Sequence, residues 1–145
     1  MDTLRAQQKN RLERLQKVET QLTAGDVGNG REIFFGDKVI CSSCHAVGDE
    51  GGDFGPDLTN IGEIRSRHDL LEAIMYPSVS FAREYETYRV KTSETTHRGV
   101  IVEQTPEMVL LQTGQESRVR IAREDIVSMQ QGSTSMMPQG LNQAL

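Results

Sequence analysis

The residues of this sequence whose types and spacing point most directly to a chemistry are Cys41, Cys44 and His45. Two residues separate the cysteines, and the histidine follows the second cysteine directly. Covalent attachment of a c-type haem requires this spacing. The two thiols add to the vinyl groups of the porphyrin, and the adjacent imidazole becomes an axial ligand of the iron. The chain has 2 cysteines in total. We therefore predict one haem c, attached through Cys41 and Cys44, with His45 as an iron ligand.

Three other kinds of site use paired cysteines, and the sequence favours each of them less. A structural zinc site needs four ligands, and the remaining histidines, His68 and His97, do not form an H-x3–5-H pair. A thioredoxin-like dithiol needs a βαβ context, which the Gly-rich flanks do not offer. A simple disulfide is geometrically poor in so short a loop, and it would leave His45 unexplained.

A second axial ligand is expected among the 6 methionines, because a Met thioether opposite the His is common in cytochromes c and raises the reduction potential. Three of them fall on a predicted helix face or in predicted strands: Met75, Met108 and Met129. Met136 and Met137 fall in a polar Gly/Ser-rich loop that Pro138 stiffens. We expect Met137 to be the ligand. Met136 is the first alternative, and His97 or an open position are the others.

Composition limits the class of protein and its partners. The chain has 145 residues and a formal net charge of −5, which argues against nucleic acid as a partner. No run approaches the roughly 18 apolar residues of a membrane span. Residues 1–23 lack the apolar region of a signal peptide. Because bacteria attach haem c outside the cytoplasm, we expect a periplasmic or otherwise exported protein, and we expect this chain to be a piece of a longer one.

Apolar spacing and capping residues predict three helices. The first covers residues 2–23, with an apolar stripe at Leu12, Leu15, Val18 and Leu22. We assign residues 1–24 to this helix and a linker, and residues 25–145 to one domain. A second helix, 27–35, follows Asp26 as its N-cap. A third follows the capping box of Ser66 and Asp69, and it ends at Tyr76-Pro77.

Short segments rich in Val, Ile, Leu, Tyr and Thr indicate strands in the second half of the chain. They are residues 85–92, 98–103, 108–112 and 118–122, separated by turn-like residues. This pattern predicts an antiparallel meander of about four strands over about residues 85–129. A fifth short strand or a turn is expected at 126–129. The fold class is therefore α+β.

A wider set of motifs resembles a known family. In order they are Gly30–Phe35, Cys41–His45, Gly55–Gly62, Asp69–Ile74, Pro77–Glu86 and Ser135–Leu141. Over about residues 25–141 the chain resembles the C-terminal haem-binding cytochrome c domain of the planctomycete and verrucomicrobial (PVC) type. The resemblance implies a class I cytochrome c-like helical haem domain, with the antiparallel sheet inserted before the Met-ligand loop.

The resemblance also implies site residues and partners. The carbonyl of Pro56 would accept a hydrogen bond from His45 and orient it, and Arg65 or Arg67 could pair with a haem propionate. Such domains take electrons from an upstream or partner dehydrogenase, so we expect electron transfer rather than an enzyme activity of this chain itself. The alternative is a haem-based sensor or small-ligand-binding domain that lacks a Met sixth ligand.

The sequence departs from that family at its C-terminal end. Domains of this type continue past Leu141 into a helix that crosses the first helix of the domain, whereas only residues 142–145 remain here. We therefore hypothesise that the N-terminal apolar stripe partly covers Gly30, Ile33 and Phe34 in place of that helix.

Overall fold

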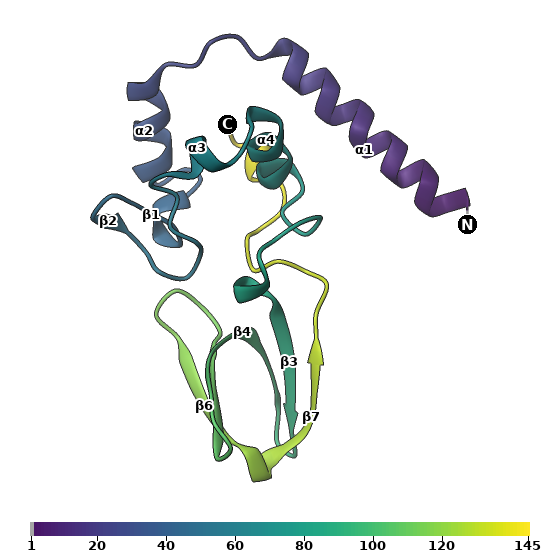
Figure 1. Ribbon diagram of the computed structural model, residues 1–145, viewed down its shortest axis with the longest axis vertical. Coiled ribbons are helices and arrows are strands. Elements are labelled where there is room, and N and C mark those ends of the chain that lie inside the picture. Colours follow the sequence, from purple (N-terminus) through teal and green to yellow (C-terminus); the bar gives the residue numbers. More distant parts are fainter. Residues whose placement is uncertain (1) are drawn as a thin grey trace.

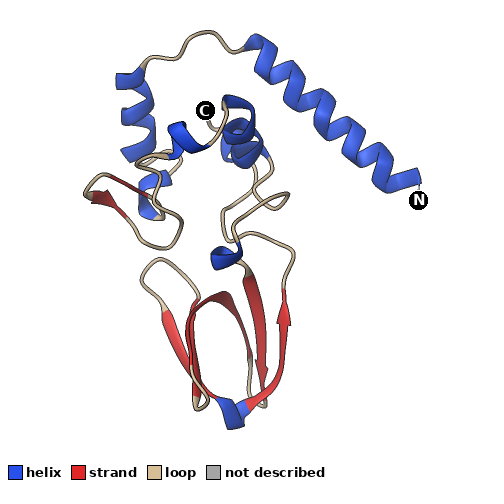
Figure 2. Ribbon diagram, viewed as in Figure 1, coloured by secondary structure: helices blue, strands red, loops and turns tan. Residues whose placement is uncertain are grey.

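Helices and strands occupy opposite ends of the molecule (Figures 1 and 2). The computed structural model describes residues 2–145. The helical end contains α1 (Asp2–Gln21), α2 (Val27–Phe35), α3 (Ile61–Ile64) and α4 (Arg67–Met75). The other end is a five-stranded antiparallel sheet. Because both chain ends lie beside the helices (Figure 1), the sheet is an insertion that the chain enters after α4 and leaves before its last turn.

Local capping signals account for the bounds of α2 and α4. The Asp26 side chain accepts a hydrogen bond of 2.7 Å from the Asn29 amide at the start of α2. Ser66 and Asp69 form a reciprocal capping box at the start of α4, and Tyr76 is its C-cap. Both helices therefore have the limits that the sequence predicts, since the caps supply partners for backbone amides that have none within the helix.

The first helix packs against α4. Leu15 is fully buried, whereas Leu12 and Leu22 keep 46% and 45% of their surface exposed. Residues of α1 and α4 are in contact with each other. Gln21 ends α1, two residues before the predicted limit.

The hypothesis that this stripe covers Gly30 is wrong. A Cβ atom added at Gly30 would meet nothing within 4 Å, and α2 contains no fully buried residue. The linker after α1 spans the top of the molecule (Figure 1), so the two helices stand on opposite sides of the helical end. An apolar stripe shows that a helix packs, but it does not identify the surface on which it packs.

The sheet has five strands within residues 2–145, not about four. They are β3 (Thr87–Thr92), β4 (Thr96–Gln104), β5 (Met108–Gln112), β6 (Arg118–Ala122) and β7 (Ile126–Gln131), in the order β6-β5-β4-β3-β7. The first four form the predicted meander. Residues 126–129, for which the sequence predicts either a short strand or a turn, belong to β7. This strand returns to pair with β3 at the opposite edge of the sheet.

The sheet builds its own apolar core. Val90, Leu111 and Ile121 are buried there, and partly buried apolar side chains from β3 to β7 pack around them. Gly99 permits a close approach of β4 to β5, because a Cβ there would collide with the carbonyl of Gln112. This close packing makes the insertion a rigid support for the loops at its upper end.

Short elements complete the chain. The loop after His45, expected to be irregular, contains a small hairpin of β1 (Ala46–Val47) and β2 (Glu50–Gly51). The described part of the chain also contains the 3-10 turns η1 (Cys41–Ser43), η2 (Arg83–Tyr85), η3 (Arg123–Asp125) and η4 (Leu141–Gln143). Among the described residues, no helix has both the length and the apolar character needed to cross a membrane.

Candidate functional site

A single tight turn, η1, holds the two cysteines and the histidine together. The amides of Cys44 and His45 both donate to the Cys41 carbonyl, at 3.2 and 3.0 Å. Ile40, just before the turn, has φ 46°, in the left-handed region. A β-branched residue rarely adopts this conformation, and it persists only where surrounding contacts hold it. Here the Ile40 carbonyl accepts hydrogen bonds from the side chain and the amide of Ser43, at 2.6 and 3.1 Å.

The two cysteines are free, half-buried thiols rather than a disulfide. Burial raises the pKa of the Cys41 thiol, and the neighbouring Cys44 raises it further, against a backbone hydrogen bond that lowers it. The Cys41 sulfur is therefore protonated at neutral pH. A thioether forms when the S–H group adds across a vinyl double bond, so the Cys41 thiol has the form that covalent attachment uses.

The carbonyl of Pro56 determines the tautomer of His45. Nδ1 of His45 lies 2.8 Å from this carbonyl oxygen. A carbonyl can only accept a hydrogen bond, so Nδ1 carries the ring proton and Nε2 keeps a free lone pair. The contact that the resemblance implies for Pro56 is thus present, and the imidazole is prepared to bind a metal through Nε2.

The loop after the motif packs its backbone directly against the His45 ring. A Cβ atom added at Gly55 would lie 2.5 to 3.0 Å from three atoms of the imidazole, which is closer than real Cβ contacts. Backbone hydrogen bonds hold this loop to the motif: Gly52 N donates to Ser42 O at 2.8 Å, and Gly55 N donates to Cys44 O at 2.6 Å. Glycine at position 55 is therefore required for the ring to stay where it is.

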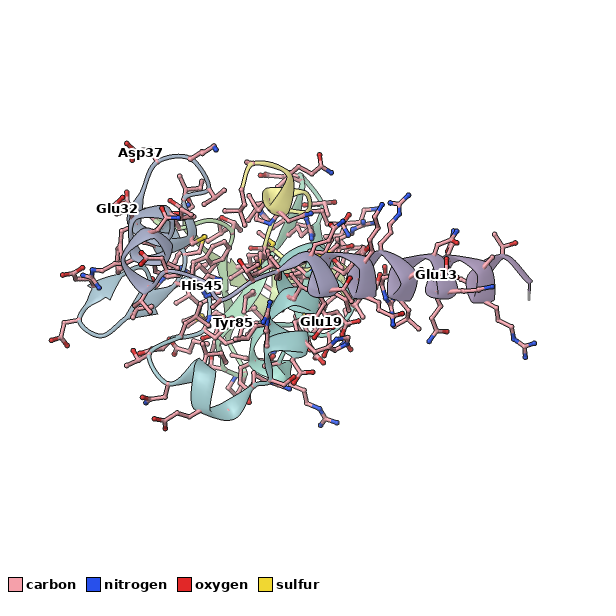
Figure 3. The ribbon with its side chains drawn as sticks, turned by 90° about the horizontal axis from the view of Figure 1, so that it is seen from above. Glu13, Glu19, Glu32, Asp37, His45 and Tyr85 are labelled. Carbon is pink, nitrogen blue, oxygen red and sulfur yellow. The ribbon has the colours of Figure 1, made fainter. Side chains whose placement is uncertain are left out.

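Tyr85 of η2 lies near the loop that follows the motif; Figure 3 labels it together with His45. Burial raises the pKa of the Tyr85 phenol, and the carboxylates of Glu84, Asp57 and Asp53, of which Glu84 is the strongest, add to the effect. Tyr85 is therefore a neutral phenol near this loop, a role that the sequence did not suggest.

The two candidate methionine ligands lie in the loop after β7. Met136 and Met137 are both half-buried. The amide of Met137 donates to the Ser135 hydroxyl at 3.1 Å, and the Ser135 amide donates to the Ser78 hydroxyl at 3.1 Å. The second contact ties the loop to the segment that follows α4.

Two residues of the sheet also anchor this loop. The fully buried Thr87 donates through its hydroxyl to the Thr134 carbonyl at 2.9 Å. The Arg98 guanidinium donates to the carbonyls of Thr134 and Ser135 at 3.0 and 3.2 Å. The inserted sheet therefore positions the methionine loop. Sequence analysis did not identify these anchors, because a Thr and an Arg in adjacent strands carry no signal of what they bind.

The remaining candidates lie on other elements than the motif. Arg65 is exposed at the C-terminal end of α3, and the Arg67 guanidinium is bound to the Leu22 carbonyl at 2.8 Å. His97 pairs with Val90 inside the sheet, and His68 pairs with Glu19 on α1. Within residues 2–145, no three His, Cys, Asp or Glu side chains are grouped so as to hold a metal ion.

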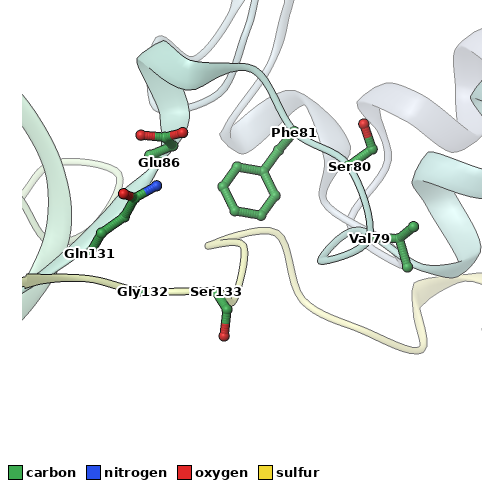
Figure 4. A pocket seen from close by; sticks show the side chains of 7 residues that line it. All are labelled: Val79, Ser80, Phe81, Glu86, Gln131, Gly132 and Ser133. Carbon is green, nitrogen blue, oxygen red and sulfur yellow. The ribbon is translucent and has the colours of Figure 1, made fainter. Parts of the chain in front are cut away.

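An open cleft lies beside the methionine loop. It has a volume of about 560 Å³, and residues 79–81, Glu86 and 131–133 line it. Figure 4 shows Phe81 extending into its centre. None of the motif residues lines it, so we treat the cleft as a feature of the junction between the helical end and the sheet.

Comparison with known families agrees with the motif and its geometry. The family model of cytochrome c matches residues 27–107. The chain belongs to the cytochrome c family. A comparison with curated proteins finds no match. As a cytochrome c domain, the chain carries a covalent haem c, consistent with Cys41 and Cys44, and its general role is electron transfer.

The residues of this cytochrome c fit the haem. The donor set comprises two half-buried cysteine side chains and an imidazole with a free Nε2. None of the apolar side chains of α2 and α4 is fully buried, so a large apolar macrocycle would complete their packing. When bound, the haem supplies one-electron chemistry, while the chain orients the iron ligand and sets its surroundings.

Proposed function

We propose that this cytochrome c domain transfers electrons through one haem with His45 and Met137 as its axial ligands. The observation that carries the proposal is the 2.8 Å contact between His45 Nδ1 and the Pro56 carbonyl, because it leaves Nε2 free as a donor to the iron. A haem with two protein ligands has no open position for a substrate, so electron exchange is its function.

The anchored loop supports a methionine as the second ligand. Its hydrogen bonds to Thr87, Arg98 and Ser78 restrict where Met136 and Met137 can be directed. We assign Met137 because it directly precedes Pro138, whose ring limits the backbone at that point. A neutral thioether favours ferrous iron, so this ligand would raise the reduction potential.

The wider setting is also part of the proposal. The order of motifs along the chain supports a PVC-type domain with a class I haem arrangement and a sheet inserted before the methionine loop. We place it in an exported or periplasmic protein, where it accepts electrons from an upstream or fused dehydrogenase. Arg65 is the proposed partner of a haem propionate, since its side chain is exposed at the end of α3.

Carbon monoxide binding to the reduced holoprotein tests the coordination. We expect the ferrous form to bind carbon monoxide slowly or not at all, because both axial positions are filled. Rapid binding by the untreated protein would show an open position and would favour a sensor or ligand-binding role instead.

Two variants identify the methionine. Met137→Ala should lower the reduction potential and remove the weak ferric charge-transfer band of a methionine–iron bond, because the thioether ligand is lost. Met136→Ala is the matched control and should leave both unchanged. The measurements are spectroelectrochemical titration and the absorption spectrum of the oxidised protein, and the reverse pattern would assign the ligand to Met136.

A further inference from the structure

The loop between β5 and β6 reaches back from the inserted sheet to the haem-attachment motif. In Figure 1 this loop rises from the sheet toward the β1–β2 hairpin. Its Gln115 side chain contacts two motif residues: Nε2 donates to the Ser43 hydroxyl at 2.7 Å and lies 3.7 Å from the Cys44 sulfur. Gln115 is 72 residues from Ser43 in sequence, so only the fold brings them together.

The positions of the protons determine the direction of these contacts. The single hydroxyl proton of Ser43 is donated to the Ile40 carbonyl at 2.6 Å, so Ser43 Oγ can only accept from Gln115. The amide nitrogen of Gln115 has two protons, and the second is available to the Cys44 sulfur. After haem attachment this sulfur is a thioether, which has no proton and can only accept. The same contact thus remains chemically matched in the holoprotein.

The sheet holds Gln115 in this position. The Gln112 side chain is 5% exposed, and its amide donates to the Gln115 carbonyl at 3.4 Å. Thr113 and Ser117 close the turn through a backbone hydrogen bond of 2.9 Å. At the start of β6, Arg118 pairs with Asp53 of the loop after the motif at 3.2 Å. The buried Gln112 amide therefore holds the turn beside the motif, and the exposed Arg118–Asp53 pair adds a second, weaker link between the two loops.

We propose that Gln115 is a positioning residue that donates a hydrogen bond to the Cys44 thioether sulfur and thereby raises the reduction potential of the haem. The positive end of an N–H dipole beside the thioether favours the form with one more electron, and hydrogen bonding around a haem is one of the means by which a protein sets its potential. By holding Gln115 in place, the inserted sheet helps to set the reduction potential of the haem. The inference rests on the attachment of the haem at Cys44.

Spectroelectrochemical titration of the holoprotein tests this inference, with Gln115→Leu and Gln115→Glu as the variants. Gln104→Leu, in an exposed residue at the far end of β4, is the matched control. We expect the potential to fall in Gln115→Leu and to fall further in Gln115→Glu, which replaces a donor by a negative charge. The control should keep the wild-type potential.

The other outcomes are distinguishable. The pyridine haemochrome spectrum of each protein first establishes two thioether bonds, and a spectrum without them would overturn both the attachment and this inference. With attachment intact, a Gln115→Leu potential equal to that of the control would overturn the inference alone. If Gln115→Leu does not mature, Ser43→Ala takes its place, because it removes the Ser43 acceptor of the Gln115 hydrogen bond. A reduction potential that is unchanged in both Ser43→Ala and Gln115→Glu would then also overturn the inference.

Discussion

The His45 imidazole is constrained by backbone atoms on two sides. The Pro56 carbonyl holds Nδ1 at 2.8 Å, and the Gly55 backbone lies against the ring. Both contacts are made by backbone atoms. The orientation of the proposed iron ligand therefore depends on the loop that follows β2.

Replacing Gly55 by alanine should disturb this orientation. The added methyl group would lie 2.5 Å from Cε1 of His45, so either the ring or the loop must move. We expect Gly55→Ala to lower the free energy of unfolding by about 1–3 kcal/mol, the usual cost of overpacking, and to alter the haem absorption spectrum. Chemical denaturation measures the first effect.

Gly62→Ala is the matched control for this variant. Gly62 lies in α3, and a Cβ there would meet nothing within 4 Å. Alanine should be neutral or slightly stabilising at that position. Equal stability and equal spectra for the two variants would show that Gly55 does not confine the ring.

The sequence predicts part of this site, and the division has a physical cause. Cys41, Cys44 and His45 are adjacent in sequence, so a local motif reveals them. Pro56 follows only from the resemblance to a family. Gln115 lies in the turn between β5 and β6, and Thr87 and Arg98 lie in strands of the same sheet, all distant in sequence from the motif. Their placement depends on sheet registration, which a single sequence does not specify.

Among the helices, α1 is held by one buried side chain and three polar contacts. Leu15 is fully buried. Around it, Arg11 lies 3.7 Å from Glu72, His68 lies 2.8 Å from Glu19, and Arg67 binds the Leu22 carbonyl. The His68–Glu19 pair is partly exposed and such pairs contribute little, and the buried Nε of Arg11 has no hydrogen-bond partner among the described residues. Leu15 therefore supplies most of the docking energy.

Truncating Leu15 should release the helix. We expect Leu15→Ala to lower the docking free energy of α1 by about 2–5 kcal/mol, as for other buried leucines. Leu12→Ala should change it by about 0.5 kcal/mol, because its side chain is 46% exposed. Amide hydrogen exchange along α1 measures both, and equal protection in the two variants would contradict the docking on α4.

The His68–Glu19 pair makes the same interface sensitive to pH. The hydrogen bond that His68 donates to the Glu19 carboxylate raises the pKa of His68 above its ordinary value of 6.5, and the nearby Glu72 and Asp69 add to this effect. A raised folded-state pKa stabilises the docked helix fully below pH 6.5, and the contribution is lost as pH rises through the folded value.

We therefore expect the amide protons of α1 to exchange faster above this pH window, after correction for the intrinsic exchange rate. Glu19→Gln should abolish the pH dependence and bring the pKa of His68 back toward its ordinary value, as an NMR titration of the ring would show. A pH dependence that persists in Glu19→Gln would assign it to another group.

For helices and strands, the sequence predicts where an element lies in the chain better than it predicts the element with which it packs or pairs. The limits of α2 and α4 follow from capping residues that act within one turn. The meander from β3 to β6 follows from strand composition and turns. The pairing of β7 with β3 and the docking of α1 on α4 are contacts distant in sequence, so residue spacing could not show them.

Acidic and basic side chains are distributed unevenly over the molecule. Residues 26–64, which contain the haem motif, have eight acidic side chains, all exposed, and two basic ones. Residues 65–145, which contain the sheet, are nearly balanced, with ten acidic and nine basic side chains. Residues 1–25 have three acidic and five basic side chains, so the excess of negative charge is concentrated in the segment that contains the haem motif. A negative field there attracts cationic reactants and repels anionic ones.

The charge of a small redox reagent should then control its rate of reaction. At low ionic strength we expect a cationic oxidant such as hexaammineruthenium(III) to react about tenfold or more faster, after correction for driving force, than the anionic ferricyanide. Stopped-flow measurement at rising salt should remove the difference, because screening shortens the range of the field to about 3 Å at 1 M.

A pair of charge variants locates the field. Asp49→Asn lies in the turn between β1 and β2, close in sequence to the motif, and Glu94→Gln lies in the turn between β3 and β4, at the far end of the sheet (Figure 1). Each removes one negative charge from an exposed side chain. The first should reduce the preference for the cationic reagent and the second should not, because the distant charge is screened. Equal effects of the two variants would mean that net charge alone steers the reagents, and that the acidic segment around the motif has no special part in it.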